Sequence, residues 1–364
     1  MVKAILRPRY VLLALALVLL AVFPYMHNWP FFDGYLSDFR TFQATRFAIW
    51  LIILMGLNLL TGYSGQISLG HAAFVTIGAY AAAIMMNEWG TPVFLAVLLA
   101  GLITGLIGFL FGIPALRLSG PYLAIATLAL VIALPQVLKH DLVDQWTGGV
   151  MGISLSSPQV PNGAASNLNI DQWLYYNCMI AAIVMTGVAW SLTRSRLGRA
   201  FVALRDSEIG AQQMGIHVSL YKMTAFGISS LYAGVGGALY IYTQSYLGPS
   251  TFDINASLTM LVMVVLGGLA SIVGSIFAAL IMTARIDLTD FIVSLVPFGD
   301  KIGIESSRGA IFGLLLILSI IFTPRGVAGS IRHAREANIG GRLRALFTKR
   351  ERRAREEEAE VLSK

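Results

Sequence analysis

Apolar residues run along this chain in long stretches separated by short polar segments. A helix needs about 20 mostly apolar residues to cross the hydrocarbon core of a membrane. Ten stretches are candidate spans: Val11–Tyr25, Phe47–Leu60, Ser68–Met86, Val93–Leu116, Tyr122–Leu138, Trp173–Thr193, Met223–Tyr246, Leu258–Gly267, Ile272–Ala284 and Ala310–Phe322. The pattern predicts an all-α fold, a polytopic transmembrane bundle of about ten helices. The two stretches on either side of Gly267-Gly268 are short, and one of them is not expected to cross fully.

The distribution of positive charge predicts the orientation of the bundle, because lysine and arginine concentrate on the cytoplasmic side. With ten crossings and a cytoplasmic N-terminus, 20 of the 26 Lys and Arg residues fall inside. Both termini are therefore expected in the cytoplasm. The first apolar stretch ends in Phe23-Pro24-Tyr25-Met26 and not in a small-x-small cleavage site, so we expect an uncleaved span and not a signal peptide.

This topology predicts three parts. Residues 1–9 form a cytoplasmic N-terminus, and residues 324–364 form a charged cytoplasmic tail. The membrane domain covers residues 10–323, with an external loop at 139–172 and a cytoplasmic loop at 194–222. The tail is expected to be a solvated helix at the membrane surface.

Composition indicates that lipid surrounds much of this chain, and it argues against disulfide, metal-binding and nucleic-acid-binding roles. The chain is 56% apolar and 12% charged, against about 25% charged in soluble domains. Its one cysteine excludes an internal disulfide, and its five scattered histidines show no metal-ligand spacing. The net charge of +7 lies mostly at the membrane edge, so no nucleic acid partner is expected.

The predicted spans hold few groups that could couple transport to an ion. No Asp, Glu or Lys lies well inside any of them, and His71 is the clear titratable residue. Ion-coupled carriers usually need an intramembrane acid or a cation site, although backbone carbonyls can also bind ions. The chain also lacks the G-x-x-x-x-G-K-[ST] phosphate loop, so an ATPase would be a separate subunit. Small residues repeat at four-residue spacing, which favours close helix packing in lipid: Gly101, Gly105, Gly108, Gly112, Gly234 and Ala238.

The cytoplasmic loop contains a short helix signal over Arg205–Ile216. Asp206 or Ser207 suits the N-cap, Glu208 suits the positive N-terminal end, and Gly215 suits the position after the C-cap. A rigid helix between two spans can transmit motion from a cytoplasmic ATPase. The alternative is a solvated loop that happens to be helical.

Six segments in order resemble one family over about residues 46–330. They are Gly62–Ala83, Gly120–Leu130, Thr147–Ile153 (a TGGxxGI pattern), Arg205–Tyr240, Met263–Gly274 and Arg308–Gly329. Together they resemble the permeases of branched-chain amino-acid ABC transporters, of the LivM-type subunit. The loop departs from that family's pattern at Gly210 and Gln212-Gln213, where alanine and glutamate are commoner.

The resemblance implies a machine with several partners in the bacterial inner membrane. It implies a second homologous permease of the LivH type, two ATP-binding subunits, and a soluble binding protein that delivers leucine, isoleucine or valine. This chain would bind no cofactor, because ATP and magnesium are used by the ATPases, and it would have no catalytic residues. The resemblance also implies ATPase-coupling residues, namely Arg205, Asp206, Ser207, Glu208 and Gly215.

The segment Gly62–His71 places small polar side chains between two spans. Non-helical backbone at membrane depth is tolerated where it lines a cavity or is buried in protein. One interpretation makes these residues part of the substrate pathway: Ser64, Gln66, Ser68 and His71. The other is a tight turn in which Ser68 caps the next helix and His71 is satisfied locally.

Other pathway candidates lie near the ends of spans. By the resemblance, Thr147, Gly148 and Gly149 face the binding protein or the entrance, and the alternative is a simple turn. Tyr122 is a further aromatic candidate. Gly62-Tyr63-Ser64-Gly65 also fits the G-x-S-G of membrane serine proteases, but a four-residue pattern with two glycines carries little weight without a histidine against the serine.

Three readings of the cargo and energy source remain at this point. The first is branched-chain amino acids. The second is urea, short-chain amides or another small polar solute moved by a permease of the same ABC family. The third is an ion-coupled carrier that acts alone.

Overall fold

The structure, a computed structural model, describes residues 38–118, 120–155, 168–244 and 246–295, with single positions at 313 and 329. Side chains of α13 are described as far as residue 284. The elements are α3 (Asp38–Leu57), the π-helical turn η2 (Asn58–Tyr63), α4 (His71–Trp89), α5 (Val93–Ala115), α6 (Pro121–Leu138), α7 (Asp141–Thr147), β1 (Ile153–Ser154), α8 (Ile170–Arg194), α9 (Arg196–Asp206), α10 (Glu208–Gln213), α11 (Val218–Tyr242), β2 (Tyr246–Leu247), α12 (Ile254–Gly267) and α13 (Ile272–Leu295).

This part of the chain is mostly helical, as the apolar pattern predicts. Five helices are long and apolar enough to cross a membrane: Arg40–Tyr63, Val93–Ala115, Pro121–Leu138, Ile170–Arg194 and Val218–Tyr242. The expected span at Ser68–Met86 is the helix α4, which is not among these five. The expected spans Val11–Tyr25 and Ala310–Phe322, both termini and the charged tail lie outside the described residues, so ten crossings and cytoplasmic termini stay predictions.

Several helix ends differ from the expectation. Helix α3 begins at Asp38 and not at Phe47, and α13 ends at Leu295 and not at Ala284. The span expected to run to Tyr246 ends at Tyr242, and the chain then enters β2, which pairs antiparallel with β1 in the register Ile153 to Leu247. The suspected break after Gly267 is present. Helix α12 has 14 residues, so it is about 21 Å long, short of the roughly 30 Å hydrocarbon core.

Helix α11 is the centre of the packing and contacts α5, α4 and α3 most extensively. Glycines allow this close approach. A Cβ atom added at Gly78 of α4 would overlap the backbone of Gly234 of α11, and one added at Gly112 of α5 would lie 2.7 Å from the Cα of Met223. Gly101, Gly105 and Gly108 of α5 also face α11, so the predicted role of the small residues in helix packing is confirmed.

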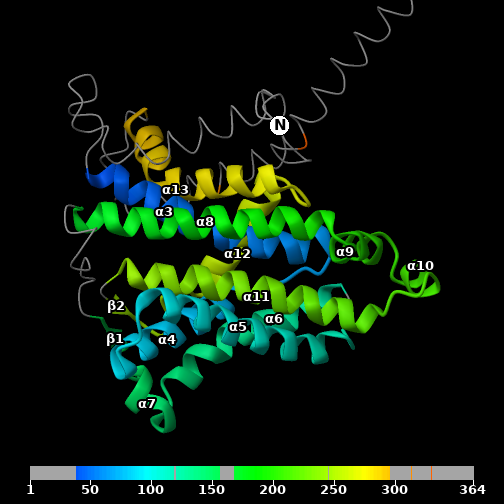
Figure 1. Cartoon of the computed structure of the whole chain (residues 1–364), viewed down its shortest axis with the longest axis horizontal. Helices are drawn as coiled ribbons and strands as arrows, with labels where there is room; N and C mark the ends of the chain where they lie inside the picture. The colour runs from blue at the N-terminus through cyan, green and yellow to red at the C-terminus, as the bar shows by residue number, and fades with distance from the viewer. Residues whose placement is uncertain are drawn as a thin grey trace, which may run out of the picture.

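Helices α3, α8 and α13 lie together on the other side of α11 (Figure 1). The two polar loops lie at opposite ends of the bundle, with α9 and α10 at one end and α7, β1 and β2 at the other (Figure 1). Two hydrogen bonds connect α8 and α11. The Tyr232 hydroxyl donates to the carbonyl of Met185 at 2.7 Å, and Trp173 Nε1 donates to the hydroxyl of Tyr242 at 3.0 Å.

We expect Gly78→Leu to destabilise the permease by about 1–3 kcal/mol or more, because an added side chain meets backbone atoms that have no room to move. Gly187→Leu on α8 is the matched control, since nothing lies within 4 Å of a Cβ there. Thermal unfolding in detergent measures both. Equal melting temperatures would contradict the packing described for α4 and α11.

Candidate functional site

The loop at residues 194–222, which was expected in the cytoplasm, forms two short helices joined at Ser207. The Ser207 side chain accepts a hydrogen bond from the Gly210 amide at 3.1 Å, so Ser207 is the N-cap of α10, and Glu208 is its first residue. Gly215 adopts φ +80°, and the amides of Ile216 and Gly215 bind the carbonyls of Ala211 and Gln212. This is a Schellman C-terminal motif. The predicted caps at Ser207 and Gly215 are confirmed, whereas Arg205 and Asp206 end the preceding helix, α9.

An apolar face fixes α9 to the transmembrane helices. Phe201 and Leu204 are buried, and Phe201 packs in a cluster with Leu60, Ala225 and Phe226. Ser195 caps the start of α9 by accepting from the amides of Leu197 and Gly198. The helix pair is therefore a packed element of the domain and not a loose loop.

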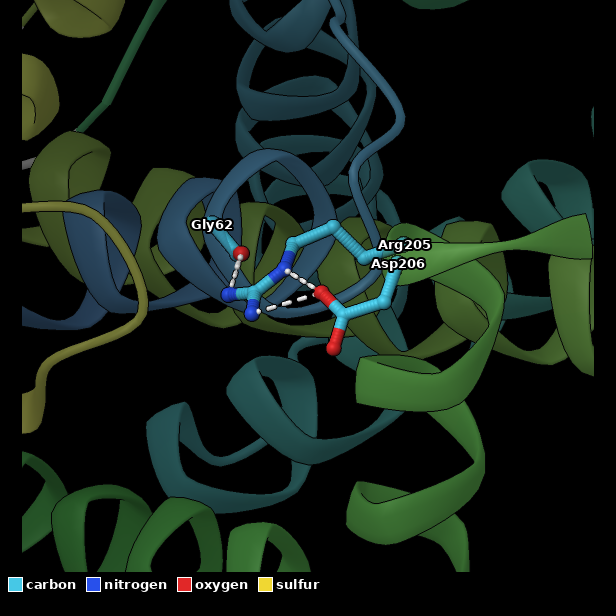
Figure 2. A network of polar contacts seen from close by, with 3 residues as sticks. All are labelled: Gly62, Arg205 and Asp206. Carbon is cyan, nitrogen blue, oxygen red and sulfur yellow. Dashed lines mark hydrogen bonds and ion pairs between the residues drawn. The ribbon is translucent and has the colours of Figure 1, made fainter.

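Two polar contacts anchor the helix pair at different places. Glu208 forms an ion pair with Lys222 at 2.7 Å, and the Lys222 side chain is almost fully buried at the start of α11. The second anchor is Arg205, whose Nη1 donates to the carbonyl oxygen of Gly62 at 3.3 Å. Figure 2 shows the Arg205 guanidinium between that carbonyl and Asp206, which accepts from Nε and Nη2 at 3.1 and 3.0 Å.

Large apolar side chains stand exposed on this polar element. Ile209 is 73% exposed and Met214 is 84% exposed. The sequence reasoning missed both because it followed caps and charges. The signal available in the sequence was an isoleucine and a methionine among the otherwise polar and small residues of Asp206–Gly215.

The segment between η2 and α4 (residues 64–70, the η2–α4 connection) turns its polar side chains into the protein. Ser64 donates to the carbonyl of Leu60 at 2.7 Å, and Gln66 donates to the Ser64 hydroxyl at 2.9 Å. Ser64, Gln66, Ser68 and His71 are all buried. The structure places these four residues in one buried segment and the helix start that follows it, and their role in a substrate pathway stays a prediction.

Two details of the turn interpretation are wrong. The N-cap of α4 is Gly70, which has no side chain, while Ser68 accepts from the Gly70 amide at 3.3 Å. The Nε2 atom of His71 binds a distant partner, the carbonyl of Ile53 on α3, at 3.0 Å, while its buried Nδ1 has no hydrogen-bond partner. Because Ser64 and His71 bind backbone carbonyls and not each other, they do not form the pair that a serine protease requires.

Three helices hold the connection in place. The Leu69 amide donates to Thr127 of α6 at 3.0 Å, and the Ser257 hydroxyl of α12 donates to the Leu69 carbonyl. A Cβ atom at Gly70 would overlap the backbone of Thr127. The segment is therefore set by contacts with α3, α6 and α12 together.

Asn58 joins η2 to the interruption between α12 and α13 (residues 268–271, the α12–α13 break). Its Nδ2 donates to the carbonyl of Ser271 at 2.9 Å and to the Ser275 hydroxyl at 2.8 Å, and reaches the Gly268 carbonyl at 3.5 Å. Its Oδ1 accepts from the Ala270 amide at 2.9 Å. Ala270 has φ +54°, a conformation that non-glycine residues rarely adopt.

Gly62 lies one turn after Asn58 and is packed against the same break. A Cβ atom at Gly62 would overlap Asn58 Oδ1 and the Ala270 amide. The contacts of Arg205, Gly62 and Asn58 thus form a continuous path from the end of α9 to the α12–α13 break. Sequence reasoning missed Asn58 because it reads as a single polar residue at the end of an apolar stretch.

The TGG segment lies at the opposite end of the molecule and forms a turn. Thr147 donates to the carbonyls of Leu138 and Val143 at 2.7 and 3.0 Å, and Gly148 and Gly149 have φ +65° and +52°. A Cβ atom at Gly149 would overlap the Asp144 carboxylate. The turn interpretation therefore accounts for all three residues, and their contact with a binding protein stays a prediction.

Tyr122 is 70% exposed at the start of α6 and takes no part in the buried polar segment. Among the described residues no group of three or more His, Cys, Asp or Glu side chains could hold a metal ion. Cys178 is buried.

We expect Asn58→Ala to destabilise the permease by more than about 2 kcal/mol, because each buried donor or acceptor left unpaired costs about 1–3 kcal/mol. Asn177→Ala is the control, since Asn177 donates to Trp173 of its own helix at 2.8 Å. The measurement is the unfolding midpoint in detergent. A loss at Asn58 no larger than at Asn177 would show that the break does not depend on this amide.

Known proteins are similar to this chain along most of its length. A family described as "Branched-chain amino acid transport system / permease component" matches residues 40–320. The high-affinity branched-chain amino acid transport system permease protein LivM of Salmonella typhimurium is 30% identical over 90% of this chain and 79% of that protein. LivM of Escherichia coli K12 is 31% identical over 87% of this chain and 74% of that protein.

A relative with another cargo in its name matches more of the length at lower identity. The autoinducer 2 import system permease protein LsrC of Escherichia coli K12 is 24% identical over 95% of this chain and 94% of that protein. No solved structure matches significantly. On the family match and the LivM relatives, the chain belongs to the branched-chain amino acid transport system permease family and is a LivM-type membrane permease.

Proposed function

We propose that this chain is the membrane-spanning subunit of an ATP-driven importer of leucine, isoleucine and valine in the bacterial inner membrane. The LivM relatives support this cargo. The capped pair α9–α10, packed on the domain and anchored to α11 through Lys222, supports coupling to an ATPase. The partners in this proposal are a LivH-type permease, two ATP-binding subunits that use ATP and magnesium, and a soluble binding protein.

The exposed surface of α10 is the proposed docking site for the ATPase. It combines the polar residues at its N-terminus, Ser207 and Glu208, with the exposed side chains of Ile209 and Met214. Exposed apolar side chains on a polar surface mark protein contacts, and such anchors contribute most of the binding free energy at interfaces. An ATPase bound to these side chains would displace α10 when the ATPase subunits close on ATP.

The ion-coupled carrier is a weaker reading of the same structure. Such a carrier would use the free carbonyls of a helix break to coordinate a cation. At the α12–α13 break the carbonyls of Gly268 and Ser271 and the hydroxyl of Ser275 surround the amide nitrogen of Asn58. The amide therefore fills the position that a coordinated cation would need.

Cargo is the part of this proposal that relatives leave most open. LivM relatives suggest branched-chain amino acids, and the match to LsrC favours a test of autoinducer 2 as well. Urea and short-chain amides are the remaining candidates in the same ABC family. The proposed lining of the substrate path consists of Ser64, Gln66, Ser68 and His71. The substrate would reach these side chains once the buried η2–α4 connection opens.

The first test is uptake of labelled leucine into vesicles that contain the full complex, with and without ATP, with urea and autoinducer 2 as alternative cargo. We expect ATP-dependent leucine uptake that Glu208→Arg lowers at least about tenfold, because Lys222 then faces a like charge at a buried site. Glu88→Arg, an exposed reversal on α4, is the control. Uptake that continues without ATP would contradict the proposal, and uptake of urea alone would change the cargo.

The docking surface is tested by Ile209→Asp, which places a charge where the ATPase is expected to bury an apolar side chain. We expect co-purification of the ATPase subunits to fall at least about tenfold, the effect of losing one central interface residue. Val150→Asp is the control, because Val150 is 71% exposed at the opposite end. Equal recovery of the ATPases with both variants would exclude Ile209 from the interface.

A further inference from the structure

Arg205 lies in the last turn of α9, yet its guanidinium is used inside the permease. One edge of the group, Nε and Nη2, is taken by Asp206 of the same helix. The other nitrogen, Nη1, donates to the carbonyl of Gly62 in η2 (Figure 2). Arginine suits this task because its planar fork binds two acceptors in a fixed geometry, whereas lysine carries a single point charge.

The backbone of η2 and its connection is built around this side chain. Gly65 has φ +74°, and a Cβ atom there would lie 2.7 Å from Arg205 Cγ and 3.2 Å from Arg205 Cβ. The chain therefore passes directly over the stem of Arg205. Contact extends along the whole side chain, from its Cβ atom to its guanidinium.

The acceptor of this bond is connected directly to the two helix interruptions. Gly62 is packed against Asn58 Oδ1 and the Ala270 amide, and Asn58 binds the α12–α13 break through its own amide. A displacement of Gly62 must therefore displace Asn58 or Ala270, because the packing leaves no space between them. Close-packed interiors transmit such shifts.

We propose that Arg205 is an internal positioning residue that makes the end of α9 and the Gly62 turn move as one body, so that displacement of the coupling helices reaches the α12–α13 break through Asn58. This inference rests on the proposed ATP-driven transport. It assigns Arg205 a role inside the permease in place of the ATPase contact that the family resemblance implies. Glu208 and Lys222 form a separate anchor that holds α10 to α11.

The two roles of Arg205 give different results when transport is split into its steps. Loss of an ATPase contact weakens assembly of the complex. Loss of an internal positioning residue leaves the ATPases bound and hydrolysing ATP while less substrate crosses per ATP. The informative quantity is therefore the ratio of uptake to hydrolysis, measured beside the amount of ATPase that co-purifies.

The first variant is Arg205→Lys, which keeps the positive charge and removes the planar guanidinium that binds two acceptors. We expect the ATPase subunits to co-purify normally and the rate of ATP hydrolysis to stay within about twofold of that of the unaltered complex. Leucine uptake per ATP hydrolysed should fall at least about tenfold, as expected for loss of a hydrogen bond to a charged group. Arg199→Lys is the matched control on the same helix. Its Nη1 also binds a carbonyl, that of Arg194 at 3.1 Å, but this bond does not reach η2.

The second variant, Gly65→Ala, displaces Arg205 without changing its chemistry, because the added Cβ overlaps the Arg205 stem. We expect the same loss of uptake per ATP. Gly90→Ala is its control, since Gly90 also has a left-handed φ of +58° but nothing within 4 Å of a Cβ. If Arg205→Lys fails to reach the membrane, Gly65→Ala decides the question with the same readouts.

Two results would overturn the inference. In one, the variants lose ATPase subunits in proportion to uptake, and Arg205 is then an ATPase contact. In the other, uptake per ATP is unchanged in both variants. The complex without substitutions distinguishes these outcomes from failure of the proposed function. If that complex shows no ATP-dependent uptake, the proposed function is wrong, whatever the variants do.

Discussion

The arrangement of the described helices depends on one constraint, the need to satisfy the backbone wherever a helix is interrupted at membrane depth. An unpaired amide or carbonyl in such a place costs several kcal/mol, about 2–7 depending on the reference state. The α12–α13 break exposes two carbonyls and an amide, and the side chain of Asn58 pairs with all three. A π-helical turn carries Asn58, which places this side chain against the break.

Glycine contacts give the rest of the bundle its rigidity. Helices α4 and α5 approach α11 so closely that added Cβ atoms at Gly78, Gly108 or Gly237 would overlap atoms of the neighbouring helix. In lipid, association of helices relies on this kind of van der Waals packing, because the hydrophobic effect does not act between them. Helices α4, α5 and α11 therefore form a stiff unit, whereas the breaks are held mainly by hydrogen bonds.

The sequence was sufficient for the features that follow local rules. Apolar length predicted where the described membrane helices lie, although α3 begins at Asp38 and not at Phe47 and α13 ends at Leu295 and not at Ala284. Small-residue spacing predicted close helix packing, and cap chemistry predicted the caps at Ser207 and Gly215. The role of Asn58 and the contact between Arg205 and Gly62 were not predicted, because the partners lie 210 or more and 143 residues away in the chain, a separation that no local pattern encodes. Ser68 was assigned as a cap for the same reason: the true start of α4, at His71, is set by contacts with Ile53, Thr127 and Ser257.

The two anchors of the coupling helices attach to parts of different stiffness, and this difference has a mechanical consequence. Glu208 holds α10 to Lys222 on α11, which belongs to the stiff unit, and Arg205 holds the end of α9 to η2, which borders the breaks. A force applied to α10 moves α11 only with its packed neighbours. The same force transmitted through Arg205 meets a region whose hydrogen bonds can exchange partners at lower cost than packed backbones can separate. If α9 and α10 couple to an ATPase as proposed, the helix breaks are the part of the domain expected to yield.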